Sequence, residues 1–515
     1  MKNLAGILRE SAEKYPKLTA VSFMGQDTDY QTLNQSANKI AHALREMGVA
    51  KGDRVAIYCI NSPFFVASYF GIQKLGATVV TINLLLHPKE VQYILKDSGA
   101  KVVIFYELFA EAVAAIKDQL PDLKGLILIG KSDKVAANNY VEIMQNAPAD
   151  PIEVDVDPKT DVAAILYTSG TTGNPKGAML THYNLMSNSA SVAHTIGITH
   201  DDVILTVLPM FHSFAMTCCI LAPVSQAGKI LAIPKFDPIM VADAIQANQA
   251  TLFFGVPSMY VMFLQLPPEK VSALDSLKYC ISGGAAMPQE VMLQFEKKFG
   301  KLIYEGDGPT ECSPVTTVNP IGGKRKIGSI GLPIRDVELK IVDDNGKELP
   351  VKTIGEIVVR GPNVMKGYFN LPEATTESFF GEWFRTGDLG EKDEEGYFYI
   401  VDRKKDMLIV NGINVYPRHV EEVLYGHPAV AEAAVIGVPD KTHGEIPKAY
   451  VVLKPGATAS AKDIRKFCMD NLGRFEIPRQ VVFLEKLPKS ATGKILKREL
   501  RKDGEIERGV KPAKE

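Results

Sequence analysis

The sequence of 515 residues is too long to form one hydrophobic core, so we expect it to fold as two to four domains. Hydrophobic residues make up 46% of the chain and charged residues 23%, which is typical of a globular protein. The 58 basic residues are balanced by 60 acidic ones, for a net charge of -2, and this argues against a protein that binds nucleic acid or an anionic membrane.

The N-terminal stretch "MKNLAGILRESAEKYPK" predicts a short amphipathic helix and lacks the apolar centre of a signal peptide. The most apolar segment, residues 210–224, is too short to span a membrane. We therefore expect a cytoplasmic protein without a transmembrane segment. No zinc site is expected, because the cysteines contain no C-x-x-C pair and most lie in apolar runs, as free thiols do. They are Cys59, Cys218, Cys219, Cys280, Cys312 and Cys468.

From about residue 30 to 310, short runs rich in valine and isoleucine alternate with helical patterns such as "NQSANKIAHALREMG". Such runs predict buried parallel strands, and the alternation predicts an α/β sheet protein. The predicted strands are residues 53–60, 77–83, 100–106, 123–130 and 161–170. From about 330 to 400, strands joined by tight turns, as in "VELKIVDDNGKELP", predict a mostly antiparallel or barrel-like piece.

The charged stretch "VDRKKD" (401–406) precedes a segment of different character. We expect residues 402–406 to link a large N-terminal domain, 1–401, to a small α/β domain, 407–515, which has an ordinary domain size. In this small domain we predict helices at 417–426 and 461–473 and strands at 429–440, 448–456 and 479–487.

The segment "YTSGTTGNPKG" (167–177) combines glycines, hydroxyls and one lysine, which suits a loop whose backbone N–H groups approach a phosphate. A nucleotide-binding P-loop would need a glycine before the lysine and a hydroxyl after it, but Pro175 and Gly177 stand there. The Walker template therefore fails, although the phosphate-binding chemistry remains. Taken alone, the segment could also be a flexible surface loop.

Five further motifs follow this loop in order: "SGGAAMP" (282–288), "EGDGPTECSP" (305–314), "WFRTGDLG" (383–390), "YIVDRKKDMLIVNGINVYP" (399–417) and "PKSATGKILKREL" (488–500). Together the six resemble the ordered signatures of the adenylate-forming superfamily, which contains acyl- and aryl-CoA synthetases, luciferases and peptide-synthetase adenylation domains. The sequence looks most like the bacterial fatty-acyl-CoA ligases.

The resemblance implies an α/β fold: a large N-terminal domain of α/β sheet subdomains plus a small β-barrel-like piece, then a small mobile C-terminal α/β domain. It also implies a two-step reaction. A carboxylic acid attacks the α-phosphate of Mg-ATP and releases pyrophosphate, and the thiol of coenzyme A then displaces AMP from the acyl adenylate. The implied cofactor and co-substrates are Mg2+, ATP and coenzyme A.

The resemblance assigns hydroxyls, backbone N–H groups and Lys176 of the loop to the phosphates, and Asp388, assisted by Arg403, to the ribose hydroxyls. Glu311 and Thr168 are the implied magnesium ligands, because hard oxygen ligands suit magnesium. The residues assigned to ATP or AMP are Thr168, Ser169, Gly170, Thr171, Thr172, Gly173, Lys176, Gly283, Gly284, Ala285, Glu305, Gly306, Asp307, Thr310, Asp388 and Arg403.

Asp307 departs from the superfamily pattern. The motif usually reads Gly-Tyr-Gly-x-Thr-Glu, with the tyrosine stacked on adenine, whereas this sequence has Gly-Asp-Gly-Pro-Thr-Glu. An aspartate cannot stack on a base. Backbone groups of residues 283–285 and 306 could still form the adenine pocket.

Lys494 matches the lysine that bridges the attacking carboxylate and the α-phosphate, where a fixed positive charge offsets the repulsion between them. Lys405 occupies the hinge position, about which the small domain is implied to rotate after adenylation. Rotation would withdraw Lys494 and present the loop at Gly412 to coenzyme A.

His212 matches a residue that gates the carboxylate pocket, and the segment around it offers no aspartate to pair with a substrate amine. The apolar pocket is expected to be lined by Phe211, Phe214, Ala215, Val256 and Pro257. These residues suit a medium- to long-chain fatty acid, but equally an aryl acid of the benzoate or hydroxycinnamate type.

Three further alternatives stay open on the sequence. The acyl group could pass to the phosphopantetheine arm of a carrier protein instead of coenzyme A. The chain could be a catalytically silent nucleotide sensor, a reading motivated only by Asp307. A homodimer is also possible.

Overall fold

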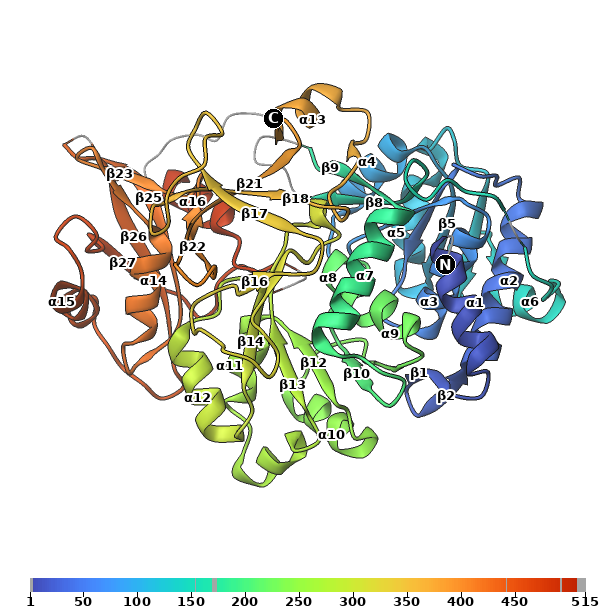
Figure 1. The fold of residues 1–515 in the computed structure, drawn as a ribbon, viewed down its shortest axis with the longest axis horizontal. Coiled ribbons are helices and arrows are strands. Elements are labelled where there is room, and N and C mark those ends of the chain that lie inside the picture. The colour runs from blue at the N-terminus through green and yellow to red at the C-terminus, as the bar shows by residue number, and fades with distance from the viewer. Residues whose placement is uncertain (1–2, 153, 169–173, 441, 491–492, 507–515) are drawn as a thin grey trace.

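The computed structural model describes residues 3–152, 154–168, 174–440, 442–490 and 493–506, with side chains described as far as residue 501. The chain forms four β-sheets flanked by helices (Figure 1). The mixed α/β class and the division into large N-terminal sheets and small C-terminal elements confirm the predicted fold class.

The first sheet contains the strands predicted between residues 53 and 170, and its order is β19-β9-β8-β4-β3-β5-β6-β7. Strands β3 to β8 run parallel where they pair, and β9 and β19 add an antiparallel edge. The bounds are β3 (Arg54–Tyr58), β4 (Thr78–Thr81), β5 (Ala100–Tyr106), β6 (Gly125–Ile129), β7 (Asn138–Asn139), β8 (Val162–Thr168), β9 (Lys176–Thr181) and β19 (Gly367–Tyr368).

The second sheet has the order β16-β15-β14-β13-β12-β10-β11-β1-β2 and is parallel from β14 to β1, with antiparallel pairs at both edges. Its strands are β1 (Thr19–Phe23), β2 (Gln26–Asp29), β10 (Val203–Thr206), β11 (Lys229–Ala232), β12 (Leu252–Gly255), β13 (Tyr279–Ser282), β14 (Ile303–Asp307), β15 (Thr317–Val318) and β16 (Leu332–Pro333).

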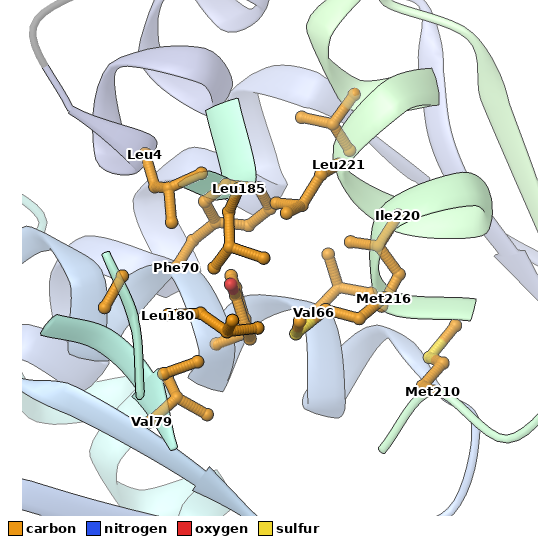
Figure 2. Close-up of a cluster of buried hydrophobic side chains, with 14 of the residues drawn as sticks. Leu4, Val66, Phe70, Val79, Leu180, Leu185, Met210, Met216, Ile220 and Leu221 are labelled. Carbon is orange, nitrogen blue, oxygen red and sulfur yellow. The ribbon is translucent and has the colours of Figure 1, made fainter. Parts of the chain in front are cut away.

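A large buried cluster joins the two sheets through the helices between them (Figure 2). It contains Leu4 of α1, Val66 and Phe70 of α3, and Leu185 of α7, all almost fully buried. The helix ends are set locally: Ser62 accepts a hydrogen bond from Phe65 N at the start of α3. The N-terminal helix expected from the first residues is confirmed as α1.

The helices of the N-terminal part are α1 (Leu4–Lys14), α2 (Tyr30–Glu46), α3 (Pro63–Lys74), α4 (Pro88–Ser98), α5 (Ala110–Ile116), α6 (Tyr140–Asn146), α7 (His182–Ile196), α8 (Ser213–Ala215), α9 (Ala222–Ser225), α10 (Pro238–Asn248), α11 (Pro257–Phe263), α12 (Gln289–Phe299) and α13 (Pro372–Glu377), with a π-helix at Met216–Leu221. No helix of the described residues is both long enough and apolar enough to cross a bilayer.

The piece predicted to be antiparallel forms a five-stranded sheet in the order β17-β18-β21-β20, with β22 paired to β21. Its strands are β17 (Glu338–Val342), β18 (Gly355–Arg360), β20 (Phe379–Phe380), β21 (Trp383–Lys392) and β22 (Phe398–Arg403). The expected linker therefore begins inside a strand, because Asp402 and Arg403 pair with Leu389 and Asp388.

The C-terminal elements form a sheet of order β24-β23-β26-β25, with β27 parallel to β26. The predicted helices and strands are all present: α14 (Pro417–Tyr425), α15 (Ala461–Asn471), β25 (Val430–Asp440), β26 (Gly444–Leu453) and β27 (Gln480–Phe483). A hairpin, β23 (Leu408–Val410) and β24 (Ile413–Val415), and helix α16 (Lys497–Ile506) complete this part. All six cysteines are buried free thiols.

Candidate active site

The glycine-rich loop connects β8 to β9, two antiparallel strands in which Thr168 pairs with Lys176. Residues 169–173, to which five of the predicted phosphate contacts belong, lie outside the described residues. The two ends of the loop, Thr168 and Lys176, are both half-buried. The hydroxyl and the lysine predicted to bind phosphate and metal therefore lie side by side at the end of this hairpin.

Glu311 lies in a short 3-10 turn, and one of its carboxylate oxygens faces the hairpin. Its Oε1 accepts hydrogen bonds from the Thr168 hydroxyl, at 3.3 Å, and from the Tyr368 hydroxyl, at 2.9 Å. The Lys176 ammonium lies 5.2 Å from the centre of the same tyrosine ring. The structure thus brings together the two predicted metal ligands and a predicted phosphate-binding lysine.

These oxygens suit magnesium, which prefers hard ligands and keeps several waters or phosphate oxygens in its shell. Within the described residues, no group of three or more His, Cys, Asp or Glu side chains could hold a metal ion. The carboxylate of Glu311 and the neighbouring hydroxyl of Thr168 are hard oxygen ligands of the kind that magnesium prefers.

Asp388 and Arg403 form an ion pair across β21 and β22, with 2.7 Å between Arg403 Nε and Asp388 Oδ1. The Asp388 side chain is only 7% exposed. Its charge raises the pKa of Arg403, which is charged in any case. The pairing predicted for the ribose site is therefore present and fixed by strand register.

Asp307 ends strand β14 beside this ion pair. Its backbone carbonyl accepts hydrogen bonds from the backbone N–H and the hydroxyl of Thr316, which hold the residue in place. Burial and the negative charge of Asp388 raise the pKa of the Asp307 carboxyl to about 6, against the opposing charges of Arg403 and Lys494. Asp307 therefore belongs to a cluster of two acids and two bases.

The glycines predicted to lie against the nucleotide are closely packed. A Cβ atom on Gly283 would come within 3.2 Å of the Phe214 ring and of the Gly306 carbonyl oxygen, and one on Gly306 within 2.8 Å of the Thr317 carbonyl oxygen. A side chain at Gly306 would force the backbone to shift, and one at Gly283 would crowd the Phe214 ring. Ala285 is exposed.

Glu305, another predicted nucleotide residue, has an almost fully buried side chain, as Asp388 has. Burial raises the pKa of its carboxyl to about 7, an effect that Arg418 opposes and Glu422 reinforces. Arg418 and Glu422 both lie on α14, in the C-terminal part of the chain. Glu305 therefore faces the surface where α14 packs.

Lys494 reaches the site from the C-terminal segment. Its Cε lies 3.6 Å from the place that a Cβ on Gly284 would occupy, and a Cβ on Gly493 would lie 2.7 Å from the Ser258 hydroxyl oxygen. Burial and the charge of Arg403 lower the pKa of Lys494, while Asp307, Asp388 and Glu311 act in the opposite direction. The predicted catalytic lysine thus lies against the predicted nucleotide glycines.

His212 begins the short helix α8, where its Nδ1 accepts a hydrogen bond from Phe214 N at 3.2 Å. Burial and the charge of Lys494 lower the pKa of His212 to about 3, so the imidazole is neutral. The hydroxyls of Ser213 and Thr310 lie 3.1 Å apart and connect this segment to the turn of Glu311.

The predicted acyl-pocket residues fall into two groups. Phe214 packs against Gly283 and edge-on against Phe254, with 6.0 Å between ring centres, and Val256 lies near Gly284 and Gly493. Val256 is itself buried, and so are the other three, Phe211, Ala215 and Pro257.

The predicted hinge residue Lys405 lies near the Asp388–Arg403 ion pair, whose charges act on it, and Gly412 lies in the hairpin that follows. Lys405 is in the turn that follows β22, where Asp406 N donates to the Arg403 carbonyl. Burial lowers the pKa of Lys405. Gly412 is at the turn of the β23–β24 hairpin with a φ of 79°, and a Cβ added there would meet no described atom within 4 Å.

Two residues of the site were missed by the sequence analysis. Tyr368 contacts both Glu311 and Lys176, and Arg418 acts on Glu305. The "KGYFN" segment around Tyr368 contains no charged pair or glycine pattern that indicates a ligand. Only the pairing of β19 with β9 places it beside the loop.

Comparison with known proteins gives two family matches. The family described as "AMP-binding enzyme" matches residues 8–369, and "AMP-binding enzyme C-terminal domain" matches residues 419–494. A long-chain-fatty-acid–CoA ligase of Bacillus subtilis is 39% identical, with 97% of this chain and 94% of that protein covered.

Solved structures are similar over nearly the whole chain. The anthranilate CoA ligase AuaEII, in complex with anthranoyl-AMP, has a TM-score of 0.93 at 30% identity and covers 98% of both chains. MatB from Rhodopseudomonas palustris, 32% identical and covering 99% of this chain and 100% of its own, has a TM-score of 0.90 with ATP bound and 0.79 as apo protein. The fold of this chain as a whole is therefore nearer to the ATP-bound form of MatB than to its apo form.

Proposed function

We propose a reaction for this chain, which belongs to the AMP-binding enzyme family and is an acid–thiol ligase. It joins a fatty acid of medium to long chain to coenzyme A in two steps. The carboxylate first attacks the α-phosphate of ATP, so that acyl adenylate forms and pyrophosphate leaves. The sulfur of coenzyme A then attacks the acyl carbon, and AMP leaves.

The observation that carries the proposal is the position of Lys494 against Gly284, near the charges of Asp307, Asp388 and Glu311. Two anions, a carboxylate and a triphosphate, must approach each other in the first step. A fixed ammonium between them stabilises the charge that builds up in the transition state more than it stabilises the separate substrates.

The other predicted residues would bind and orient the nucleotide. Asp388, held by Arg403, would accept hydrogen bonds from the ribose hydroxyls, and Lys176 with the loop would bind the phosphates. Glu311 and Thr168 would hold magnesium, which would neutralise phosphate charge when bound. His212, neutral and beside Lys494, would border the carboxylate without adding a charge.

We assign the acyl site to the neighbourhood of the apolar side chains Phe214 and Val256, because both border the glycines beside Lys494. A fatty acid is the first choice, in line with the B. subtilis relative. An aryl acid is the alternative, favoured by the structural likeness to the anthranilate ligase. We further propose residues 402–406 as the linker between domains 1–401 and 407–515, with rotation about Lys405 bringing Gly412 toward coenzyme A.

The test is the release of AMP and pyrophosphate from Mg-ATP with decanoate, palmitate or benzoate, each with and without coenzyme A. We expect turnover that requires an acid, accelerates with coenzyme A and is faster with the two fatty acids. A preference for benzoate would support the aryl alternative. Pyrophosphate release that does not change when coenzyme A is added would indicate a carrier-protein acceptor. No release with any acid would indicate a silent nucleotide sensor.

A further inference from the structure

Tyr368 lies between Glu311, which we assign to a cation, and Lys176, which we assign to the nucleotide phosphates. Its hydroxyl donates to Glu311 Oε1 at 2.9 Å, and its ring lies 5.2 Å from the Lys176 ammonium. Within the described residues, no ion pair within 4.0 Å joins Lys176 to a carboxylate. The tyrosine thus contacts both charges while they stay apart.

Separation of these charges matters for binding. A carboxylate that serves a cation and an ammonium that serves a phosphate are less available to their ligands if they pair with each other, since the pair must first be broken. A phenol can satisfy both at once, because its hydroxyl donates to a carboxylate while its ring face attracts a cation.

The side-chain hydrogen bonds to the Glu311 carboxylate occupy one of its two oxygens and leave the other available. Both hydrogen bonds that described side chains donate to Glu311, from Thr168 and Tyr368, end on Oε1. In the described part of the chain, Oε2 is therefore the oxygen left for a ligand. A phenol is protonated at neutral pH, so the Tyr368 hydroxyl is a hydrogen-bond donor to this carboxylate.

The backbone around Tyr368 is fixed from three sides. Tyr368 N donates to the Thr375 hydroxyl at 2.8 Å, and Phe369 N donates to the carbonyl of Gly177, next to Lys176, also at 2.8 Å. Met365 N donates to the Glu311 carbonyl at 2.7 Å. The phenol therefore has a defined position relative to both partners.

We propose that Tyr368 is a positioning residue that keeps Glu311 free for a divalent cation and Lys176 free for the nucleotide phosphates. This inference rests on the proposed function, which assigns those tasks to Glu311 and Lys176. Tyr368 acts through these two side chains and needs no contact with the substrate.

The test separates the two contacts of the phenol. Tyr368→Phe keeps the ring and removes the hydroxyl, whereas Tyr368→Leu removes both. Mn2+ binding to the protein with a non-hydrolysable ATP analogue is followed by electron paramagnetic resonance, and ATP binding in EDTA by calorimetry. The matched control is Tyr399→Phe, since the Tyr399 hydroxyl also donates to a carboxylate, that of Asp393, at 3.2 Å.

We expect Tyr368→Phe to weaken Mn2+ binding about tenfold, the scale of one hydrogen bond to a charged group, and to leave metal-free ATP binding unchanged. Tyr368→Leu should weaken both, because Lys176 can then pair with Glu311. The control should change neither. Mn2+ affinity in Tyr368→Phe equal to that of the control would overturn the proposal.

Glu311→Gln distinguishes this outcome from a failure of the proposed function. If this variant binds Mn2+ as the wild type does, Glu311 is not a metal ligand, and both the assignment and the inference fall. If it weakens Mn2+ binding while Tyr368→Phe does not, only the inference on Tyr368 falls. Thermal unfolding of each variant checks that it is folded.

Discussion

Burial shifts the pKa values of two side chains at the site in opposite directions, and in both it favours the neutral form. It lowers the pKa of His212 to about 3, which leaves a neutral imidazole beside the positive charge of Lys494. It raises the pKa of the Glu305 carboxyl to about 7, which is close to neutral pH. Near neutral pH, His212 therefore stays uncharged, whereas the Glu305 carboxyl changes between its protonated and ionised forms.

The Glu305 shift makes a prediction about stability. Between its ordinary value of 4.5 and about 7, the folded protein holds a proton on Glu305 that the unfolded chain has lost. The free energy of unfolding therefore falls as the pH rises through this window, by up to about 3 kcal/mol. Since Glu305→Gln cannot ionise, its unfolding free energy should fall less between pH 5 and pH 8 than that of the wild type.

Urea unfolding at the two pH values measures this difference. Glu290→Gln, which changes an exposed glutamate of α12, is the control and should behave as the wild type. If the free energy of unfolding decreased equally between the two pH values in the wild type and in Glu305→Gln, the Glu305 carboxyl would not be buried as described.

The site residues differ in how far the sequence predicts them. Glu311, Asp388, Arg403 and Lys494 follow from short motifs, and the structure brings them together. The surroundings of Asp307 could not be predicted from a sequence motif. Its charged neighbours come from β21, β22 and the C-terminal segment, which are far away in the sequence. Such neighbours depend on tertiary packing, which no local pattern encodes.

At the scale of elements, the turn before Lys494 is the contact that places the lysine. Gly493 has a φ of 77°, and its N–H donates to the Ser490 carbonyl at 2.9 Å. A side chain there would meet Ser258, which lies in α11 of the large domain. A glycine therefore allows this turn to approach the large domain closely.

Gly493→Ala should reduce acid-dependent pyrophosphate release at least about tenfold, because a displacement of about 1 Å at a reacting group is costly. Gly456→Ala is the matched control: its φ is 76°, and a Cβ there meets nothing described within 4 Å. Both variants share a backbone cost of about 1 kcal/mol, so their melting temperatures should be similar. Equal activity in the two variants would contradict close docking of this turn.

Most elements could be predicted from hydrophobic pattern and turn residues, including the parallel strands β3 to β6 and the C-terminal helices α14 and α15. The division of the parallel strands into two sheets could not, since strand order depends on contacts between distant segments. The expected linker likewise overlaps β22, because strand pairing with β21 continues to Arg403.

At the scale of the whole molecule, the site is built from both ends of the chain. Thr168, Gly284 and Glu311 come from the N-terminal part, and Lys494 from the last segment before α16. The similarity to the ATP-bound form of MatB is higher than to its apo form, in line with this arrangement. If the proposed rotation occurs, one lysine serves the first half-reaction and is withdrawn for the second.

The most direct test compares the two half-reactions of Lys494→Ala. Adenylate formation, followed as pyrophosphate release, should fall about 100-fold or more, as when a charge-stabilising group is removed from an active site. Thioester formation from supplied acyl adenylate and coenzyme A should be largely retained, and Lys486→Ala, at an exposed lysine of the same segment, should affect neither. An equal loss of both half-reactions in Lys494→Ala would contradict the assigned role of this lysine.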